Sequence, residues 1–210
     1  MSLSSGRVFI TFEGGEGAGK TTLIDKIYQA LLSKGLKVAK TRAPGGTKVG
    51  EEIRHLLLNR RDHAIAKRCE LLLFLADRAQ HVEEVIFPLL EEGQIVLCDR
   101  FNDSTLAYQG GARGFNREEV RKLCDFACLG LQPQLTLYLD IDPKVGLDRV
   151  LKAGFTKDRI ESEQLAFHQK IREAFHQIAK EEPKRFQLID AHVDRQTVFK
   201  EAMKRIESIL

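Results

Sequence analysis

The sequence has few cysteines and no long hydrophobic run. The cysteines stand at positions 69, 98, 124 and 128, and none forms a CxxC pair. Cys124 and Cys128 have no second pair of metal ligands to complete a zinc site, so we expect reduced thiols in a core. No stretch of 18 apolar residues is present, and the first six residues lack the charged-then-apolar layout of a signal peptide. We therefore expect a cytoplasmic protein with no membrane partner.

The sequence also lacks a strong charge bias. Its 33 basic and 30 acidic residues give a formal net charge of +3, and they are spread along the whole chain. Without a basic stripe to follow a phosphodiester backbone, we expect no nucleic-acid partner. There is no low-complexity tract, internal repeat or linker, and 43% of the residues are hydrophobic. The 210 residues are therefore interpreted as a single domain, 1–210.

What is present is an alternation of two kinds of segment. Short apolar runs, mostly β-branched, occupy 8–12, 36–41, 95–98, 135–141 and 186–189. Helical periodicity fits 23–31, 71–86, 117–129, 143–152, 161–180 and 194–209. This alternation is typical of the α/β class, in which helices cover a parallel sheet.

A glycine-rich stretch follows the first predicted strand. Residues 14–21 read GGEGAGKT, which matches G-x-x-x-x-G-K-[ST] between a strand and an amphipathic helix. The glycines let successive backbone N–H groups approach an anion, and the helix points its positive end at the same place. We therefore predict a polyphosphate-binding P-loop. Its predicted nucleotide-binding residues are Gly14, Gly15, Glu16, Gly17, Ala18, Gly19, Lys20, Thr21 and Thr22.

Individual side chains extend this prediction to a metal ion and to a second phosphate. Lys20 would neutralise the β and γ oxygens, and the Thr21 hydroxyl would join the shell of a Mg²⁺ ion. Asp99 directly follows a predicted strand, as a Walker B carboxylate does, where it could act on the magnesium shell or on Arg100. Arg42 and Arg100 each follow a strand and would reach the same crevice.

A P-loop alone does not separate a kinase from a GTPase switch, a motor or a small-molecule ATPase. The chain has no N-K-x-D guanine-reading motif, which disfavours the GTPase. Two guanidinium groups favour an acceptor that carries its own phosphate. Because a phosphate oxygen is already anionic, such an acceptor needs no general base.

Five segments together resemble bacterial thymidylate kinases. They are FEGGEGAGKTT, TRAPGGT, LLLFLADRAQH, DRFNDSTLAYQGGARG and KDRIE, and the likeness runs in order from about residue 8 to the C-terminus. The resemblance implies transfer of phosphate from ATP to dTMP, giving ADP and dTDP, with Mg²⁺. It also implies a three-layer P-loop kinase fold with a five-stranded parallel sheet, a short mobile lid at about 149–160, and usually a homodimer.

The resemblance also assigns residues to the acceptor site. It puts Phe74 under the thymine ring and Arg78 at a thymine carbonyl oxygen. Thr105 and Gln109 would line the base pocket, with Ser104 beside them.

The sugar and the phosphates would meet other side chains. By the same resemblance Tyr108 would crowd the sugar, and Glu16 would meet the deoxyribose 3′-hydroxyl. Arg42 and Arg100 would keep their phosphate roles as catalytic residues, together with Lys20.

The lid is basic, like the lids of the family. Arg149 is expected to bind ATP, Arg159 to reach the charge of the transition state, and Lys157 to be the second candidate for that role. The predicted lid is about one residue longer and poorer in arginine than the family's usual form.

The loop after the second strand departs from the family in one residue. It carries Ala43 where the family usually has glutamate, so a carboxylate near the sugar or the metal is missing. The resemblance also predicts a cis bond between Ala43 and Pro44. A kinase for another nucleoside monophosphate or for a nucleoside, and a regulatory ATPase, stay open as alternatives.

Overall fold

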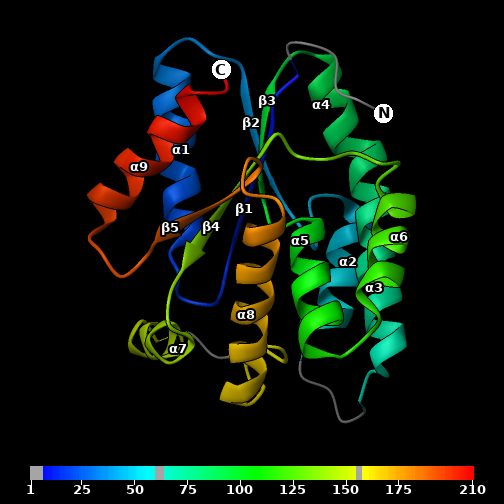
Figure 1. Cartoon of the computed structure of the whole chain (residues 1–210). Helices are drawn as coiled ribbons and strands as arrows, with labels where there is room; N and C mark the ends of the chain where they lie inside the picture. Colours follow the sequence, from blue (N-terminus) through cyan, green and yellow to red (C-terminus); the bar gives the residue numbers. More distant parts are fainter. Residues whose placement is uncertain (1–6, 60–63, 155–157) are drawn as a thin grey trace.

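A single all-parallel sheet organises the computed structural model, which describes residues 7–59, 64–154 and 158–210. The strand order is β2-β3-β1-β4-β5 (Figure 1). The strands are β1 Phe9–Gly14, β2 Val38–Arg42, β3 Ile95–Asp99, β4 Leu135–Asp140 and β5 Phe186–Asp190. Every one coincides with a predicted apolar run to within two residues. The predicted α/β class and five-stranded parallel sheet are therefore confirmed.

Helices cover both faces of the sheet and make three layers (Figure 1). One face carries α1 Lys20–Ser33 and α9 Arg195–Glu207. The other face carries α3 Lys67–His81, η1 Val82–Ile86, α4 Phe87–Glu91, α5 Asn102–Thr105, η2 Leu106–Ala112, α6 Arg117–Ala127 and α8 Leu165–Glu181. Two further helices, α2 Lys48–Leu58 beside α3 and α7 Pro143–Lys152, lie near the carboxyl ends of the strands.

The central strand β1 shows why the sheet needs both layers. Ile10 and Phe12 pack into the core under α1 and α9, whereas Phe9 packs on the opposite face against Phe101. All three phenylalanine and isoleucine side chains are fully buried. A parallel strand buried on both faces is continuously apolar, which explains why these runs were readable in the sequence. Within the described residues no helix has the length and apolar composition needed to cross a membrane.

The helix boundaries correct two predictions and add a helix that was not predicted. The helix predicted at 71–86 is α3, starting earlier at Lys67, followed by the π-helical η1. The helix predicted from residue 161 begins only at Leu165, because the Asp158 carboxylate accepts the N–H groups of Ile160 and Glu161 and holds a turn there. Helix α2 was not predicted, although the Thr47 hydroxyl caps it by accepting the Gly50 N–H.

Helix α7 lies directly against the P-loop. A Cβ atom on Gly146 of α7 would lie 2.2 Å from the Glu16 carbonyl oxygen, and one on Gly17 would lie 2.1 Å from the Gly146 carbonyl oxygen. Gly17 also has φ +67°, which glycine adopts most easily. The two backbones therefore touch where no side chain fits, and this contact places α7 and its cations over the nucleotide loop.

We predict that Gly146→Ala lowers thermal stability. Helix propensity alone favours alanine by about 1 kcal/mol, which would raise the melting temperature. A clash with backbone atoms instead costs about 1–3 kcal/mol, as other overpacked sites do. Gly110→Ala is the matched control, because its Cβ would meet nothing closer than 3.7 Å. Thermal unfolding of both variants distinguishes the two signs, and a more stable Gly146→Ala protein would contradict the close contact.

Candidate active site

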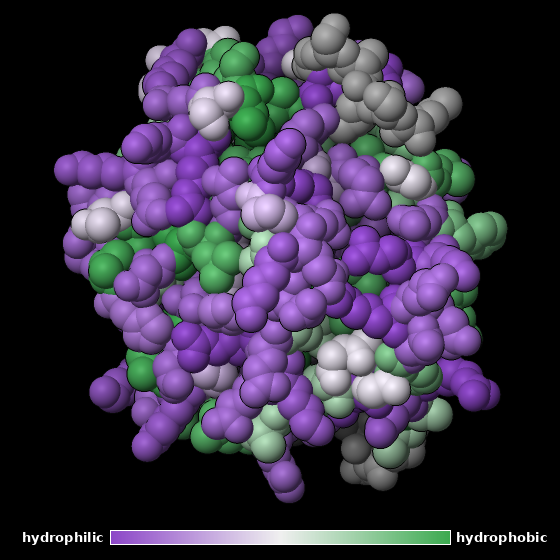
Figure 2. Space-filling view, viewed as in Figure 1, coloured by the Kyte–Doolittle hydropathy of each residue, from purple (hydrophilic) through white to green (hydrophobic). Residues whose placement is uncertain are grey.

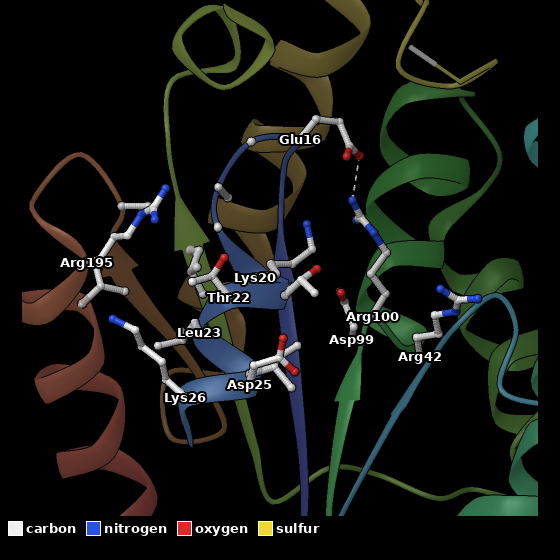
Figure 3. A pocket seen from close by; sticks show the side chains of 18 of the residues that line it. Glu16, Lys20, Thr22, Leu23, Asp25, Lys26, Arg42, Asp99, Arg100 and Arg195 are labelled. Carbon is white, nitrogen blue, oxygen red and sulfur yellow. Dashed lines mark hydrogen bonds and ion pairs between the residues drawn. The ribbon is translucent and has the colours of Figure 1, made fainter. Parts of the chain in front are cut away.

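The register of three neighbouring strands brings the predicted phosphate residues to one level. Arg42 at the end of β2 and Phe12 of β1 are both paired with Asp99 at the end of β3. The carboxyl ends of these strands open into a cavity of about 1440 Å³, lined by residues 16–26 of the P-loop and α1 and by Arg42, Asp99 and Arg100 (Figure 3). Sites for one small ligand usually measure about 300–1,000 Å³, so this cavity has room for two.

The P-loop cradle surrounds Lys20, the first residue of α1. Its side chain is 8% exposed, and its Nζ donates to the carbonyl oxygens of Gly14 and Gly15 at 3.0 and 3.2 Å. Burial and the charge of Arg100 lower the pKa of Lys20, while Asp99 and Glu16 oppose the shift. An ammonium group this poorly solvated gains strongly from an anion in the cavity.

Both residues of the predicted metal site line this cavity. They are Asp99 and Thr21, and Asp99 Oδ1 is buried without a hydrogen-bond partner. An uncompensated carboxylate oxygen and a hydroxyl in one cavity fit Mg²⁺, which takes one or two protein oxygens and completes its shell with water and phosphate. No cluster of three or more acidic, histidine or cysteine ligands occurs in the described part of the chain.

Two arginines, one of them missed by the sequence analysis, stand at the β2 side of the cavity. Arg42 Nη2 donates to both oxygens of Glu51 at 2.9 and 3.0 Å. Arg54 of α2 also lines the cavity, and it donates to the Pro44 carbonyl at 2.8 Å. The helix that carries Arg54 was not predicted, so its orientation could not be read from the sequence.

Arg100 faces the P-loop across the cavity. Its Nη2 donates to Glu16 Oε1 at 2.7 Å (Figure 3). Its guanidinium lies 5.2 Å from the centre of the Tyr108 ring. Burial would raise the pKa of Glu16, but the charges of Arg100 and Lys20 outweigh it and lower that pKa. The Tyr108 hydroxyl lies 3.4 Å from the same Glu16 oxygen. Predicted sugar and phosphate residues therefore lie side by side.

The loop after β2 is held from behind by helix α3. Asp77 Oδ1 accepts the Gly45 N–H at 2.7 Å, and His81 Nε2 lies 2.6 Å from Thr41 Oγ1. The bond between Ala43 and Pro44 is cis, which confirms that prediction. The loop that presents Arg42 is thus fixed by polar groups that the sequence analysis did not single out.

The predicted base-binding residues lie on α3, α5 and η2. Arg78 is 2% exposed, its guanidinium is 4.3 Å from the centre of the Phe101 ring, and its Nε and Nη1 have no hydrogen-bond partner. Phe74 lies one turn earlier on α3 and is half-buried. Thr105 and Gln109 are buried nearby on α5 and η2, and Gln109 Nε2 donates to Glu70 at 3.2 Å. None of these residues lines the large cavity.

The opposite end of the cavity carries further cations. Arg149 and Lys152 of α7 and Arg195 at the start of α9 line it beside the apolar Val193. Arg149 Nη1 donates to the Ala191 carbonyl at 3.1 Å. Figure 3 shows Arg195 and Arg42 on opposite sides of Lys20. Arg149 was predicted to bind ATP and Lys152 falls within the predicted basic lid, whereas Arg195 and Val193 were not predicted.

Arg159 lies away from the cavity. Its Nη2 donates to Glu70 at 2.5 Å, its Nε donates to the Leu57 carbonyl at 2.7 Å, and it does not line the cavity. Glu70 is 2% exposed and also accepts hydrogen bonds from Arg113 Nε and Nη2. In this arrangement Arg159 links α2 and α3, so its transition-state role stays a prediction. Lys157 lies outside the described residues.

A P-loop, a carboxylate at the end of the adjacent strand, and paired guanidiniums in one large cavity define a P-loop phosphotransferase of the nucleoside monophosphate kinase type. The thymidylate kinase family model matches residues 12–202. This chain belongs to the thymidylate kinase family.

Individual relatives match nearly the whole chain. A thymidylate kinase from Protochlamydia amoebophila is 49% identical over 206 residues, which cover 95% of this chain and 92% of the relative. One from Bacillus pumilus is 44% identical over 204 residues, covering 97% and 96%. The crystal structure of thymidylate kinase from Ehrlichia chaffeensis matches with a TM-score of 0.76 and 33% identity, over 95% of this chain and 98% of that one.

We predict that His81 makes the protein sensitive to acid. Burial, helped by the charge of Arg78, lowers the pKa of His81 to about 3. Because the folded-state pKa is below the unfolded one, the stabilisation is complete above about pH 6.5 and is lost as the pH falls toward 3. The free energy of unfolding of wild type relative to that of His81→Gln should therefore fall by about 2 kcal/mol between pH 7 and pH 5. Urea unfolding at both pH values measures this, and a pH-independent difference would contradict it.

Proposed function

We propose that this chain transfers the γ-phosphoryl group of ATP directly and in line to dTMP, giving dTDP, a step toward dTTP. The observation that carries the proposal is the single cavity in which Lys20, Arg42 and Arg100 meet in a member of this family. Charge neutralisation and positioning supply the catalysis, as in phosphoryl transfers generally.

The donor half of the site binds ATP. The P-loop N–H groups and Lys20 hold the β- and γ-phosphates, and Arg149 lies beside them on α7. Asp99 and Thr21 would hold Mg²⁺, which supplies charge neutralisation between the phosphate oxygens when bound. We propose that the segment 149–160 is a short lid, because Arg149 and Lys152 at its start reach the cavity wall.

The acceptor half binds the phosphate of dTMP between Arg42 and Arg100. Each guanidinium is held by a carboxylate, Arg42 by Glu51 and Arg100 by Glu16. Incoming phosphate takes over donors that are already in place, so little reorganisation is needed. The phosphate oxygen then attacks as an anion, and none of these side chains has to remove a proton.

The base is recognised by Arg78. Two of its nitrogens, Nε and Nη1, are buried donors without an acceptor, which costs free energy unless a ligand accepts their hydrogen bonds. A thymine carbonyl oxygen is such an acceptor. Phe74 offers a ring to stack on the base, and Glu16 meets the 3′-hydroxyl beside Tyr108. Both halves fit within one chain, as a single catalytic domain of residues 1–210 requires.

We also propose that the protein is a cytoplasmic homodimer. Leu72 of α3 and Leu123, Phe126 and Leu129 on and after α6 are exposed apolar side chains of two helices in contact, and Phe126 is 84% exposed. We interpret them as one apolar patch. Figure 2 shows hydrophobic colour at the edge of the molecule where Figure 1 places α6. Such a patch on a helix pair suits a second copy of the same surface. A cytoplasmic location supplies both nucleotides.

The acceptor panel tests the proposed reaction. ADP formation with Mg-ATP should be fastest with dTMP and slower with dUMP, CMP, AMP and thymidine. A site that pairs its polar groups with one base edge can lower kcat/KM for an unmatched base by roughly 10⁴. Steric crowding against one extra group, such as a ribose 2′-hydroxyl, discriminates by only about 1–3 kcal/mol. Equal rates with several bases would contradict the thymine assignment, and steady ATP hydrolysis without transfer would contradict the kinase.

The matched variant in the same panel is Arg78→Ala. Hydrogen bonds from a charged donor contribute about 1.5–3 kcal/mol, so KM for dTMP should rise by about 10- to 100-fold. The KM for ATP should stay unchanged, since Arg78 does not line the cavity that contains the P-loop. An unaltered KM for dTMP would contradict the base-reading role.

The proposed dimer can be tested by Phe126→Glu. A charge in the middle of the apolar patch should dissociate the dimer, as measured by sedimentation velocity. Leu32→Glu is the control, because Leu32 is 40% exposed on α1, across the sheet from α6. A monomeric wild type, or a dimer that both variants leave intact, would contradict this surface.

A further inference from the structure

A fully buried glutamate stands directly before the P-loop. Glu13 of β1 is 0% exposed and does not line the cavity. Its carboxylate accepts three hydrogen bonds from one segment, namely Phe101 N–H at 2.8 Å, Ser104 N–H at 3.2 Å and Ser104 Oγ at 2.5 Å. Burying a carboxyl group is costly, and burial raises the pKa of Glu13 to about 7. The P-loop motif does not require a buried glutamate at this position.

The segment that Glu13 binds is the turn that presents Arg100. Arg100 has φ 70°, a left-handed conformation that is rare for a large side chain. Its own N–H donates to the Phe12 carbonyl at 2.9 Å. The turn is therefore fixed to two consecutive residues of β1, by the main chain of Phe12 and by the side chain of Glu13. A rare backbone conformation such as that of Arg100 persists only where the surrounding contacts fix it.

Ser104 connects the carboxylate to the guanidinium. The Ser104 hydroxyl donates its single hydrogen to Glu13 Oε2. Its oxygen, Ser104 Oγ, therefore accepts the hydrogen bond from Arg100 Nη1 at 3.2 Å. The opposite nitrogen, Nη2, donates to Glu16 in the cavity. Arg100 is thus held by Ser104 through Nη1 and by Glu16 through Nη2, and Figure 3 shows the contact with Glu16.

We propose that Glu13 is a positioning residue for Arg100, acting through Ser104 and through the turn at 100–104 to aim the guanidinium at the acceptor phosphate. This rests on the proposed function, because the phosphate is that of dTMP. When the substrate displaces Glu16 from Nη2, the Ser104 contact and the anchored turn still fix the plane of the guanidinium. Bidentate binding of phosphate requires that plane.

The family resemblance implies a place for Ser104 beside the base-pocket residues Thr105 and Gln109. In the structure its hydroxyl lies between Glu13 and Arg100. Arg78, the proposed base-reading residue, forms no hydrogen bond to Glu13 or Ser104 within the described residues, and its Nε and Nη1 have no partner. Glu13 and Ser104 should therefore affect binding of the phosphate and leave binding of the base intact.

Paired ligands separate these two effects. Calorimetry would measure Kd for dTMP, which has the phosphate, and for thymidine, which lacks it, with wild type, Glu13→Gln, Ser104→Ala and Arg100→Ala. Ordering one free side chain costs about 0.5–1.5 kcal/mol, so Glu13→Gln and Ser104→Ala should weaken dTMP binding by about 3- to 10-fold. Thymidine affinity should change by less than twofold, and Ser104→Thr should restore dTMP binding.

A double-variant cycle supplies the second criterion. In the Arg100→Ala background Glu13→Gln should have no further effect on dTMP binding, since there is no guanidinium left to aim. Equal losses for dTMP and thymidine, or the same loss with and without Arg100, would assign Glu13 to folding alone and overturn the proposal. If Glu13→Gln does not fold, Ser104→Ala and its threonine rescue give the same decision.

The controls distinguish this inference from the proposed function. A wild type that binds thymidine as tightly as dTMP would contradict the acceptor-phosphate site itself. A wild type that prefers dTMP, with a preference that Glu13→Gln and Ser104→Ala leave unchanged, would contradict the positioning role alone.

Discussion

The site depends on the hydrogen-bond register of β2, β3 and β1. Because Arg42 and Phe12 are both paired with Asp99, β2 and β3 end at one level and β1 ends two residues beyond it. The P-loop and both arginine loops therefore leave the sheet at the same edge. A shift of one residue would turn every side chain to the opposite face, which the buried Ile10, Phe12 and Phe9 forbid. The apolar core and the phosphate site are therefore specified by the same register.

Charge balance is the second constraint on this cleft. Lys20 and Arg100 are mostly buried, and the charges of Glu16 and Asp99 act on both. Removing the carboxylate partner of a buried cation is far more costly than replacing that carboxylate with another anion. Nucleotide phosphates can thus replace carboxylates with the guanidiniums already ordered, which is the preorganisation that phosphoryl transfer needs.

The sequence predicted those parts whose signal is local. The five strands were readable because both faces are apolar, and the P-loop because its spacing is unusual. The acceptor residues Phe74 and Arg78 came only from family resemblance, since on periodicity Phe74 belongs to a core and Arg78 to a solvated face. Asp77, His81 and Glu13 were missed because their partners, such as the Gly45 N–H, become neighbours only after folding. Single-residue patterns contain no trace of such contacts.

Arg159 and Arg149 illustrate why sequence proximity to a lid does not decide a role. Both are basic and lie at the two ends of the predicted lid segment. Arg149 lies on α7, which the Gly17 and Gly146 contact fixes over the P-loop, and it faces the cavity. Arg159 follows a turn built by Asp158 and binds the buried Glu70. For Arg159 to reach ATP, Glu70 would have to lose one of its two guanidinium partners in a buried setting. That cost is absent for Arg149 and for Lys152, so the geometry favours α7 as the source of positive charge on the ATP side.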